Sequence, residues 1–506
     1  MSPRYLTLCV VLTTFIIALS RCGPEPQPPL PPNIANICYC SDTLKPDSLC
    51  YVIPHEIAIP DSLVNQGYGV SFDSLRQPYF DIFSWQSFVA LNWPSDNNGN
   101  PVPGAFKTDN TSWRVWEHYA DPDTVFGPVQ KEVPPAVFAE AHSKKKKVLH
   151  MRSKFQDVDS VGLGHNAFFE ADGNALIDQN MNYVVFEEKI NPDELAYIDA
   201  AGLRTQAGQE RWTDSLHHSI DLPGGTYDTL TKNGRGSGGR VGAIEMKASW
   251  RILIPGKDSM DHYYHQPAII YIDGAYTTNH QPLKVEQEVG LVGLHIIHKT
   301  SQNFGKFMVW STFEHEDNVP DNMQSNQQAG SQEKQFSFYN PHSIGAEVNA
   351  PPVPHSGDNV VRWSPTMPYA RGYGNYIQSE TPDTQATQVV RLYPVYYYTE
   401  LVNQQWRNKL KGTVWEHYKL IGSQWGQPPD GPPFDTISAP QYLGNSTMET
   451  YIQQNAGCIN CHGDFAKIAG HGNRPKSDFS FLFGHATLPL LTLDSLDRPK
   501  RITIPK

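Results

Sequence analysis

The sequence predicts an α+β protein with a large, β-rich and mainly antiparallel body, flanking helices, and a small helical segment near the C-terminus. Three observations support this class. Runs of β-branched and aromatic residues, separated by Gly, Asn and Pro, occupy the middle of the chain. Few long helical patterns separate these runs, which favours antiparallel sheets. Helical patterns occur instead on both sides of the strand-rich region.

Residues 1–21 are predicted to form a signal peptide, so we expect the chain to be exported. Arg4 precedes an apolar run from Tyr5 to Leu19, and this run is too short to span a bilayer comfortably. Ala18-Leu19-Ser20 fits the small-x-small rule for ordinary signal peptidase.

A second cleavage site competes with the first. Leu19-Ser20-Arg21-Cys22-Gly23 resembles a bacterial lipoprotein box, although Arg21 occupies a position that usually holds a small residue. Cleavage there would make Cys22 the lipid-bearing first residue. The proline-rich stretch Pro24 to Pro32 would extend away from a membrane, which slightly favours the lipoprotein. We assign residues 22–65 to a tether rich in Pro and Cys.

Residues 66–440 are expected to form the β-rich body. A helix is predicted over Phe80–Trp93, where an apolar face ends at Pro94. A second helix is predicted from Thr399 to Lys411, with Gly412 directly after its end. The expected strands are Tyr183–Phe186, Ala243–Leu253, Ala268–Ile272, Val289–Thr300 and Lys306–Phe313.

Residues 441–506 contain the strongest motif of the chain, Cys458-Ile459-Asn460-Cys461-His462. C-x-x-C-H is the attachment signature of c-type haem, in which two thiols bond to the porphyrin and the histidine binds iron. Positions three apart share a helix face, so both sulfurs and the imidazole can reach one macrocycle. A structural zinc site is a weaker interpretation, because no second Cys pair lies near. We therefore predict one covalently attached haem c, held by Cys458 and Cys461, with His462 as the proximal iron ligand.

A short helix is expected to lead from Ser446 toward Ala456, because Ser446 and Glu449 have the spacing of a capping box. The stretch from Asn445 to Phe483 resembles the haem-binding segment of c-type cytochromes. Together with SWQSFVALNW and WSTFEHEDNVP, it is similar to an uncharacterised group of exported bacterial mono-haem proteins. The resemblance implies haem attachment outside the cytoplasm, and it implies no particular reaction.

The residue on the other side of the iron distinguishes two kinds of haem protein. A low-spin electron carrier needs a sixth ligand, Met or His, whereas a haem that handles oxygen or peroxide keeps that position open. No Met follows Met448. His471, between two glycines that allow a loop to approach a flat porphyrin, is the candidate distal ligand. Other candidates are Met448, His485, His295, His298 and His315.

His295 and His298 are expected to lie on one strand with their side chains on opposite faces of the sheet. They would therefore chelate a metal poorly together. Glu314-His315-Glu316-Asp317 is dense enough for a metal or acid–base site, but a solvated turn is the better interpretation.

Three of the seven cysteines remain for a structural role, namely Cys38, Cys40 and Cys50. They cannot all pair within one chain. A disulfide between Cys38 and Cys50, or between Cys40 and Cys50, is plausible in an exported protein.

The formal net charge of −12 makes nucleic acid an unexpected partner. We expect a periplasmic or cell-surface protein, anchored to the membrane by lipid if Cys22 is modified. The first functional hypothesis is a mono-haem c-type protein that transfers electrons to or from a redox partner protein. The alternatives are a haem enzyme, such as a peroxidase or oxygenase, with open iron coordination, and a surface binding protein with structural haem.

Overall fold

The fold is known from a computed structural model. Among the residues it describes, no helix is long and apolar enough to cross a membrane. The predicted signal peptide, Cys22 and His471 lie outside these residues. The structure describes residues 37, 39–40, 49–60, 72–126, 133–150, 175–225, 240–300, 308–321, 335–343, 347–351, 360–374, 385–426, 442–470 and 474–486.

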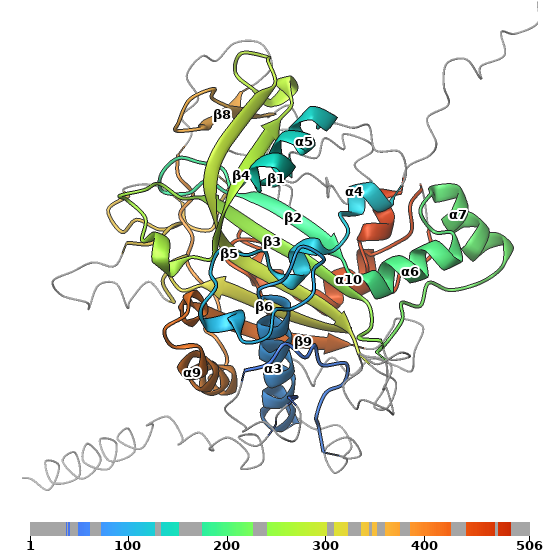
Figure 1. Cartoon of the computed structure of the whole chain (residues 1–506). Helices are drawn as coiled ribbons and strands as arrows, with labels where there is room; N and C mark the ends of the chain where they lie inside the picture. Colours follow the sequence, from blue (N-terminus) through green and yellow to red (C-terminus); the bar gives the residue numbers. More distant parts are fainter. Residues whose placement is uncertain are drawn as a thin grey trace, which may run out of the picture.

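A seven-stranded sheet forms the centre of the fold (Figure 1). The 17-residue strand β5 pairs with β4 along its first part, with β6 along its second part, and with β3 on its other side. All pairings in this sheet are antiparallel except the one between β1 and β4. The strands are β1 (Lys147–His150), β2 (Val185–Ile190), β3 (Ile244–Ile252), β4 (His265–Ile272), β5 (Leu283–Lys299), β6 (Met308–His315) and β9 (Tyr418–Gly426). A separate two-stranded ribbon consists of β7 (Val360–Trp363) and β8 (Ala370–Gly374).

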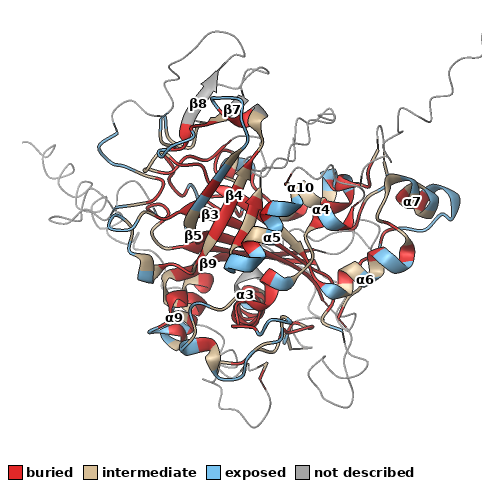
Figure 2. Ribbon diagram, turned by 45° about the horizontal axis from the view of Figure 1, so that its top comes forward, coloured by how far each residue is buried: buried red, intermediate tan, exposed pale blue. Residues whose placement is uncertain are grey.

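Helices flank the sheet, which confirms the predicted α+β class with mainly antiparallel strands. Helix α3 runs across one face, and Figure 2 shows that it and the strands beneath it are largely buried. The described α-helices are α3 (Phe72–Leu91), α4 (Pro122–Val125), α5 (Pro135–Lys144), α6 (Pro192–Ala201), α7 (Gln206–Glu210), α9 (Tyr397–Leu410) and α10 (Cys458–Phe465).

Aromatic side chains of α3 attach it to the sheet and to α9. The rings of Trp85 and Phe88 lie 5.0 and 4.3 Å from the ring of Phe313 on β6. Trp85 also stacks on Trp406 of α9, at 6.0 Å between ring centroids. Buried aromatic pairs of this kind add to the free energy gained from apolar burial. Helices α3 and α9 therefore cover the same face of the sheet.

The predicted helices are present with shifted ends. Helix α3 begins at Phe72, earlier than expected, and ends at Leu91 rather than Trp93. Helix α9 is capped by Tyr396 and not by Thr399, whose hydroxyl instead donates a hydrogen bond to Asp81 of α3 (2.7 Å). A residue with capping chemistry is used here to connect two helices.

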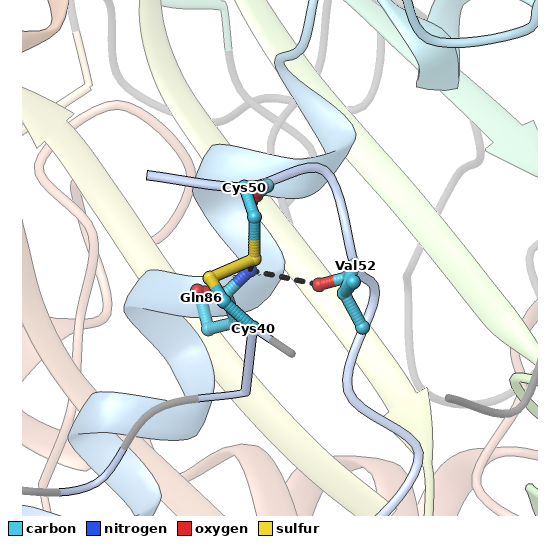
Figure 3. The surroundings of a disulfide bond; sticks show 4 residues. All are labelled: Cys40, Cys50, Val52 and Gln86. Atoms are coloured by element: carbon cyan, nitrogen blue, oxygen red, sulfur yellow. Dashed lines mark hydrogen bonds between the residues drawn. A yellow bond between two sulfur atoms is a disulfide. The ribbon is translucent and has the colours of Figure 1, made fainter. Parts of the chain in front are cut away.

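A disulfide joins Cys40 to Cys50, which is one of the two predicted pairings (Figure 3). Gln86 of α3 donates hydrogen bonds to the carbonyl oxygens of Cys50 and Val52, at 3.1 and 2.8 Å. The disulfide and these bonds fix the stretch before α3 to the helix. Cys38 lies outside the described residues.

Candidate haem attachment site

The C-x-x-C-H motif forms the beginning of α10. Gly457 precedes the helix in an extended conformation, and the backbone N–H of Cys461 donates to the carbonyl oxygen of Gly457 (3.0 Å). Cys458, Cys461 and His462 therefore have helical spacing, which brings the three side chains to one side of the helix. The expected helical character of the C-terminal segment is confirmed.

The helix predicted from Ser446 to Ala456 is wrong. That stretch forms turns that end in a short 3-10 helix, Gln453–Asn455. Asn445 accepts the capping hydrogen bond from the backbone N–H of Thr447 (2.9 Å), while the Ser446 hydroxyl donates to Glu314 of β6 (2.6 Å). The Ser446 side chain is thus bound to the sheet and cannot cap a helix.

His462 has the orientation of a metal ligand. Its Nδ1 lies 2.7 Å from the carbonyl oxygen of Phe479. A carbonyl oxygen only accepts, so Nδ1 carries the hydrogen, and Nε2 keeps its lone pair. Burial lowers the pKa of His462 to about 4, and the imidazole is therefore neutral at physiological pH. A neutral imidazole whose other nitrogen is fixed by a hydrogen bond is the form that binds metal.

Aromatic rings surround this imidazole. The ring of Phe481 lies 4.7 Å away in an edge-on arrangement, and that of Trp310 on β6 lies 5.5 Å away. The Nε1 atom of Trp310 is buried, with no hydrogen-bond partner in the part of the chain that the structure describes. A buried N–H without a partner is unfavourable, and a bound group with oxygen acceptors would satisfy it.

The two cysteines of α10 are free thiols. Burial raises the pKa of Cys458 well above its ordinary value, and it raises the pKa of Cys461 to about 11, with a smaller contribution from the nearby carboxylate of Glu449. Both side chains are therefore neutral thiols in the haem-free chain. When a thiol adds to a vinyl group, sulfur bonds to one carbon and the hydrogen goes to the other.

The segment that precedes α10 lies directly on the sheet, on the side away from α3. The hydroxyl groups of Ser249 on β3 and Thr447 are 2.7 Å apart. A Cβ atom at Gly293 of β5 would lie only 2.4 Å from Thr447 Oγ1, so a residue without a side chain is required there. The backbone of β5 thus allows the segment around Thr447, which precedes α10, to approach the sheet closely.

The segment that follows α10 is held by polar contacts. Lys299 at the end of β5 binds both carboxylate oxygens of Asp478, at 2.8 and 2.7 Å. The side chain of Gln209 accepts from the backbone N–H of Ala469 (2.9 Å) and donates to the carbonyl oxygen of Phe483 (3.1 Å). These contacts fix both sides of the Phe479 carbonyl to the body of the protein.

The structure separates the candidate distal ligands. The ring of His298 lies 5.2 Å from Phe83 of α3, whereas His295 faces the haem segment, 3.5 Å from Glu449. The prediction that His295 and His298 point to opposite faces is confirmed. Met448 is fully buried in an apolar cluster with Val292 and other residues, so its side chain serves packing.

His315 is not a candidate ligand, because both ring nitrogens are engaged. Its Nδ1 accepts from the backbone N–H of Asp317 (3.1 Å), and its Nε2 donates to the carbonyl oxygen of His262 (3.0 Å). Glu314 and His315 are buried at the end of β6, so the interpretation of this cluster as a solvated turn is wrong for these two residues. Glu314 is paired with Arg391 (2.7 Å).

His485 is buried, and its Nε2 lies 3.9 Å from Glu188 of β2.

Within the described ranges, no group of three or more His, Cys, Asp or Glu side chains is arranged to hold a metal ion by itself. Iron bound through a porphyrin needs only axial ligands from the protein. The free thiols and the orientation of His462 fit this requirement.

Phe479, Trp310 and Lys299 belong to the site but were not identified from the sequence. Each acts through a contact between distant parts of the chain, and no local motif signals such a contact.

Comparisons with known protein families, curated proteins and solved structures found no match to this chain.

Proposed function

We propose that this chain is an exported mono-haem c-type protein that transfers single electrons. The observation that carries the proposal is the hydrogen bond from His462 Nδ1 to the Phe479 carbonyl oxygen, at the end of a C-x-x-C-H motif with two free thiols. Together these features give a histidine ready to bind iron next to two thiols ready to bind porphyrin.

The haem, when bound, supplies a one-electron couple at its iron. The residues of this chain would hold and shield it. Cys458 and Cys461 would bond to the porphyrin, and His462 would bind the iron. Trp310 and Phe481 cover the imidazole with aromatic surface, which would keep water away from a group bound to it.

Electron transfer is favoured over the alternatives by the rigid setting of this ligand. His462 is partly buried, and the segments on both sides of α10 are bound to the sheet by several hydrogen bonds. A haem that only exchanges electrons needs little rearrangement around the iron, so a fixed ligand suits it. A redox partner protein would then be needed, and with the predicted signal peptide the exchange would take place in the periplasm or at the cell surface.

A redox titration of the purified, haem-loaded protein tests this function. We expect one reversible one-electron transition and a ferric haem that does not react with hydrogen peroxide. Rapid reaction with peroxide would contradict electron transfer and support the haem enzyme. His462→Ala should abolish the reversible transition, whereas His265→Ala, on the half-exposed part of β4, should leave it unchanged.

A further inference from the structure

His295 is a second histidine next to the proposed haem site. It lies on β5, directly opposite Lys247 of β3 and Thr312 of β6. Side chains at paired positions share one face of a sheet, and this is the face on which Glu449 and α10 lie. His295 is therefore carried by the central, best-supported strand of the molecule.

The side chain of His295 is linked to that of His462 through Trp310. Trp310, which contacts the ring of His462, is two residues from Thr312, the partner of His295 across the sheet. Diagonal neighbours on one face of a sheet are about 7–8 Å apart, within reach of an aromatic side chain. Both imidazoles therefore lie near Trp310, on the same face of the sheet.

The contacts of His295 are incomplete. Its Nε2 atom is buried and has no hydrogen-bond partner within the described part of the chain. The closest carboxylate oxygen is Glu449 Oε2, at 3.5 Å, and the backbone N–H of Asn445 fixes that carboxylate at 2.8 Å.

Three of the other candidate residues are less suited to bind the iron. Met448 is enclosed in an apolar cluster, both ring nitrogens of His315 are occupied, and His298 lies on the α3 side of the sheet. The imidazole of His295, 13% exposed, is on the face of the sheet on which the C-x-x-C-H helix lies.

We propose that His295 supplies the second axial ligand of the haem iron through its Nε2 atom. This inference rests on the proposed haem attachment. Ligation by two imidazoles would close the iron to small molecules and give a lower reduction potential than ligation by His and Met. His295 would then decide that the haem carries electrons and does not bind oxygen or peroxide.

The test uses full-length protein loaded with haem in a host that attaches haem c. Four quantities are measured: covalent haem on a denaturing gel, the ferric spin state, carbon monoxide binding by the ferrous form, and the midpoint potential. Wild type should be low-spin and should not bind carbon monoxide. His295→Ala should retain covalent haem, become high-spin and bind carbon monoxide, and added imidazole should restore the low-spin form.

Two further variants sharpen the result. His295→Met keeps the volume of the side chain and offers a thioether, so it should fold and shift the potential upward. His265→Ala, on the same sheet but remote from α10, should behave like wild type.

The inference is overturned if wild type already binds carbon monoxide, or if His295→Ala stays low-spin and closed. In the second case, loss of the low-spin form in His471→Ala would assign the ligand to that residue instead. Absence of covalent haem in every variant, wild type included, would overturn the proposed function itself and this inference with it.

Discussion

The ammonium group of Lys299 lies 2.7 Å from Asp478 Oδ2, and both side chains are buried. Asp478 directly precedes Phe479, whose carbonyl oxygen accepts the hydrogen bond from His462. The end of β5 is therefore connected to the orientation of the proposed iron ligand through a single peptide unit. Burial raises the pKa of Asp478, and Lys299 only partly offsets that shift. The pair thus positions the segment more than it stabilises the fold.

Asp478→Asn should destabilise the protein by about 3–5 kcal/mol, because it removes the closer carboxylate from the buried charge of Lys299 and leaves Asp221 at 3.8 Å. Chemical denaturation measures this difference. Asp199→Asn is the matched control, since Asp199 pairs with Arg204 at the surface and its loss should change stability by about 0–1 kcal/mol. Equal effects of the two substitutions would contradict the role assigned to Asp478.

Glu194 of α6 and Glu245 of β3 form a buried pair of carboxyl groups near the haem segment. Burial and the charge of Glu245 raise the pKa of Glu194 well above its ordinary value. Burial also raises the pKa of Glu245 to about 7. Such a pair holds a proton that the unfolded chain releases at lower pH.

The contribution of this pair to stability should therefore fall as pH rises between about 4.5 and 7, because the pair binds more protons in the folded state than in the unfolded state in this range. Glu245→Gln should flatten this dependence and raise the free energy of unfolding at pH 8 by about 1–3 kcal/mol, at about 1.4 kcal/mol per pKa unit. Thermal unfolding at several pH values checks the slope. The exposed Glu347→Gln serves as control, and an unchanged slope in Glu245→Gln would refute the shared proton.

Cys22→Ser should move the protein from the membrane fraction to the soluble fraction, because acyl chains would provide the anchor. Fractionation followed by immunoblotting measures the distribution. Partitioning that does not change, or a mature N-terminus at Arg21, would show that ordinary signal peptidase cleaves the chain and that Cys22 carries no lipid.

The sequence identified those parts of the fold that leave a local pattern. The runs around Ile244–Ile252 and Met308–His315 contain β-branched and aromatic residues, and both are strands in the central sheet. The first part of β5 was missed because Leu283 to Glu288 is mostly polar and pairs only with β4 at the outer part of the sheet. Strand β9 was also missed, since its pairing with β6 joins positions about a hundred residues apart.

In the candidate site, too, the residues that follow a local pattern were predicted and those that depend on tertiary contacts were not. Cys458, Cys461 and His462 are adjacent in the chain, so their shared helix face follows from spacing alone. The contacts of His462 with Phe479 and Trp310, and the position of His295, depend on tertiary structure. The helix expected at Ser446 failed for the same reason, because its capping hydroxyl binds Glu314 across the molecule.

The central claim is that Cys458 and Cys461 hold one haem covalently, and the intact mass of the denatured protein tests it most directly. The protein should be matured in a host that attaches haem c, extracted with acidified acetone and then measured. We expect the mass of the processed chain plus one haem, and the mass of the chain alone for the variant with Cys458→Ala and Cys461→Ala. A wild-type mass without haem, together with haem in the acetone extract, would contradict the account.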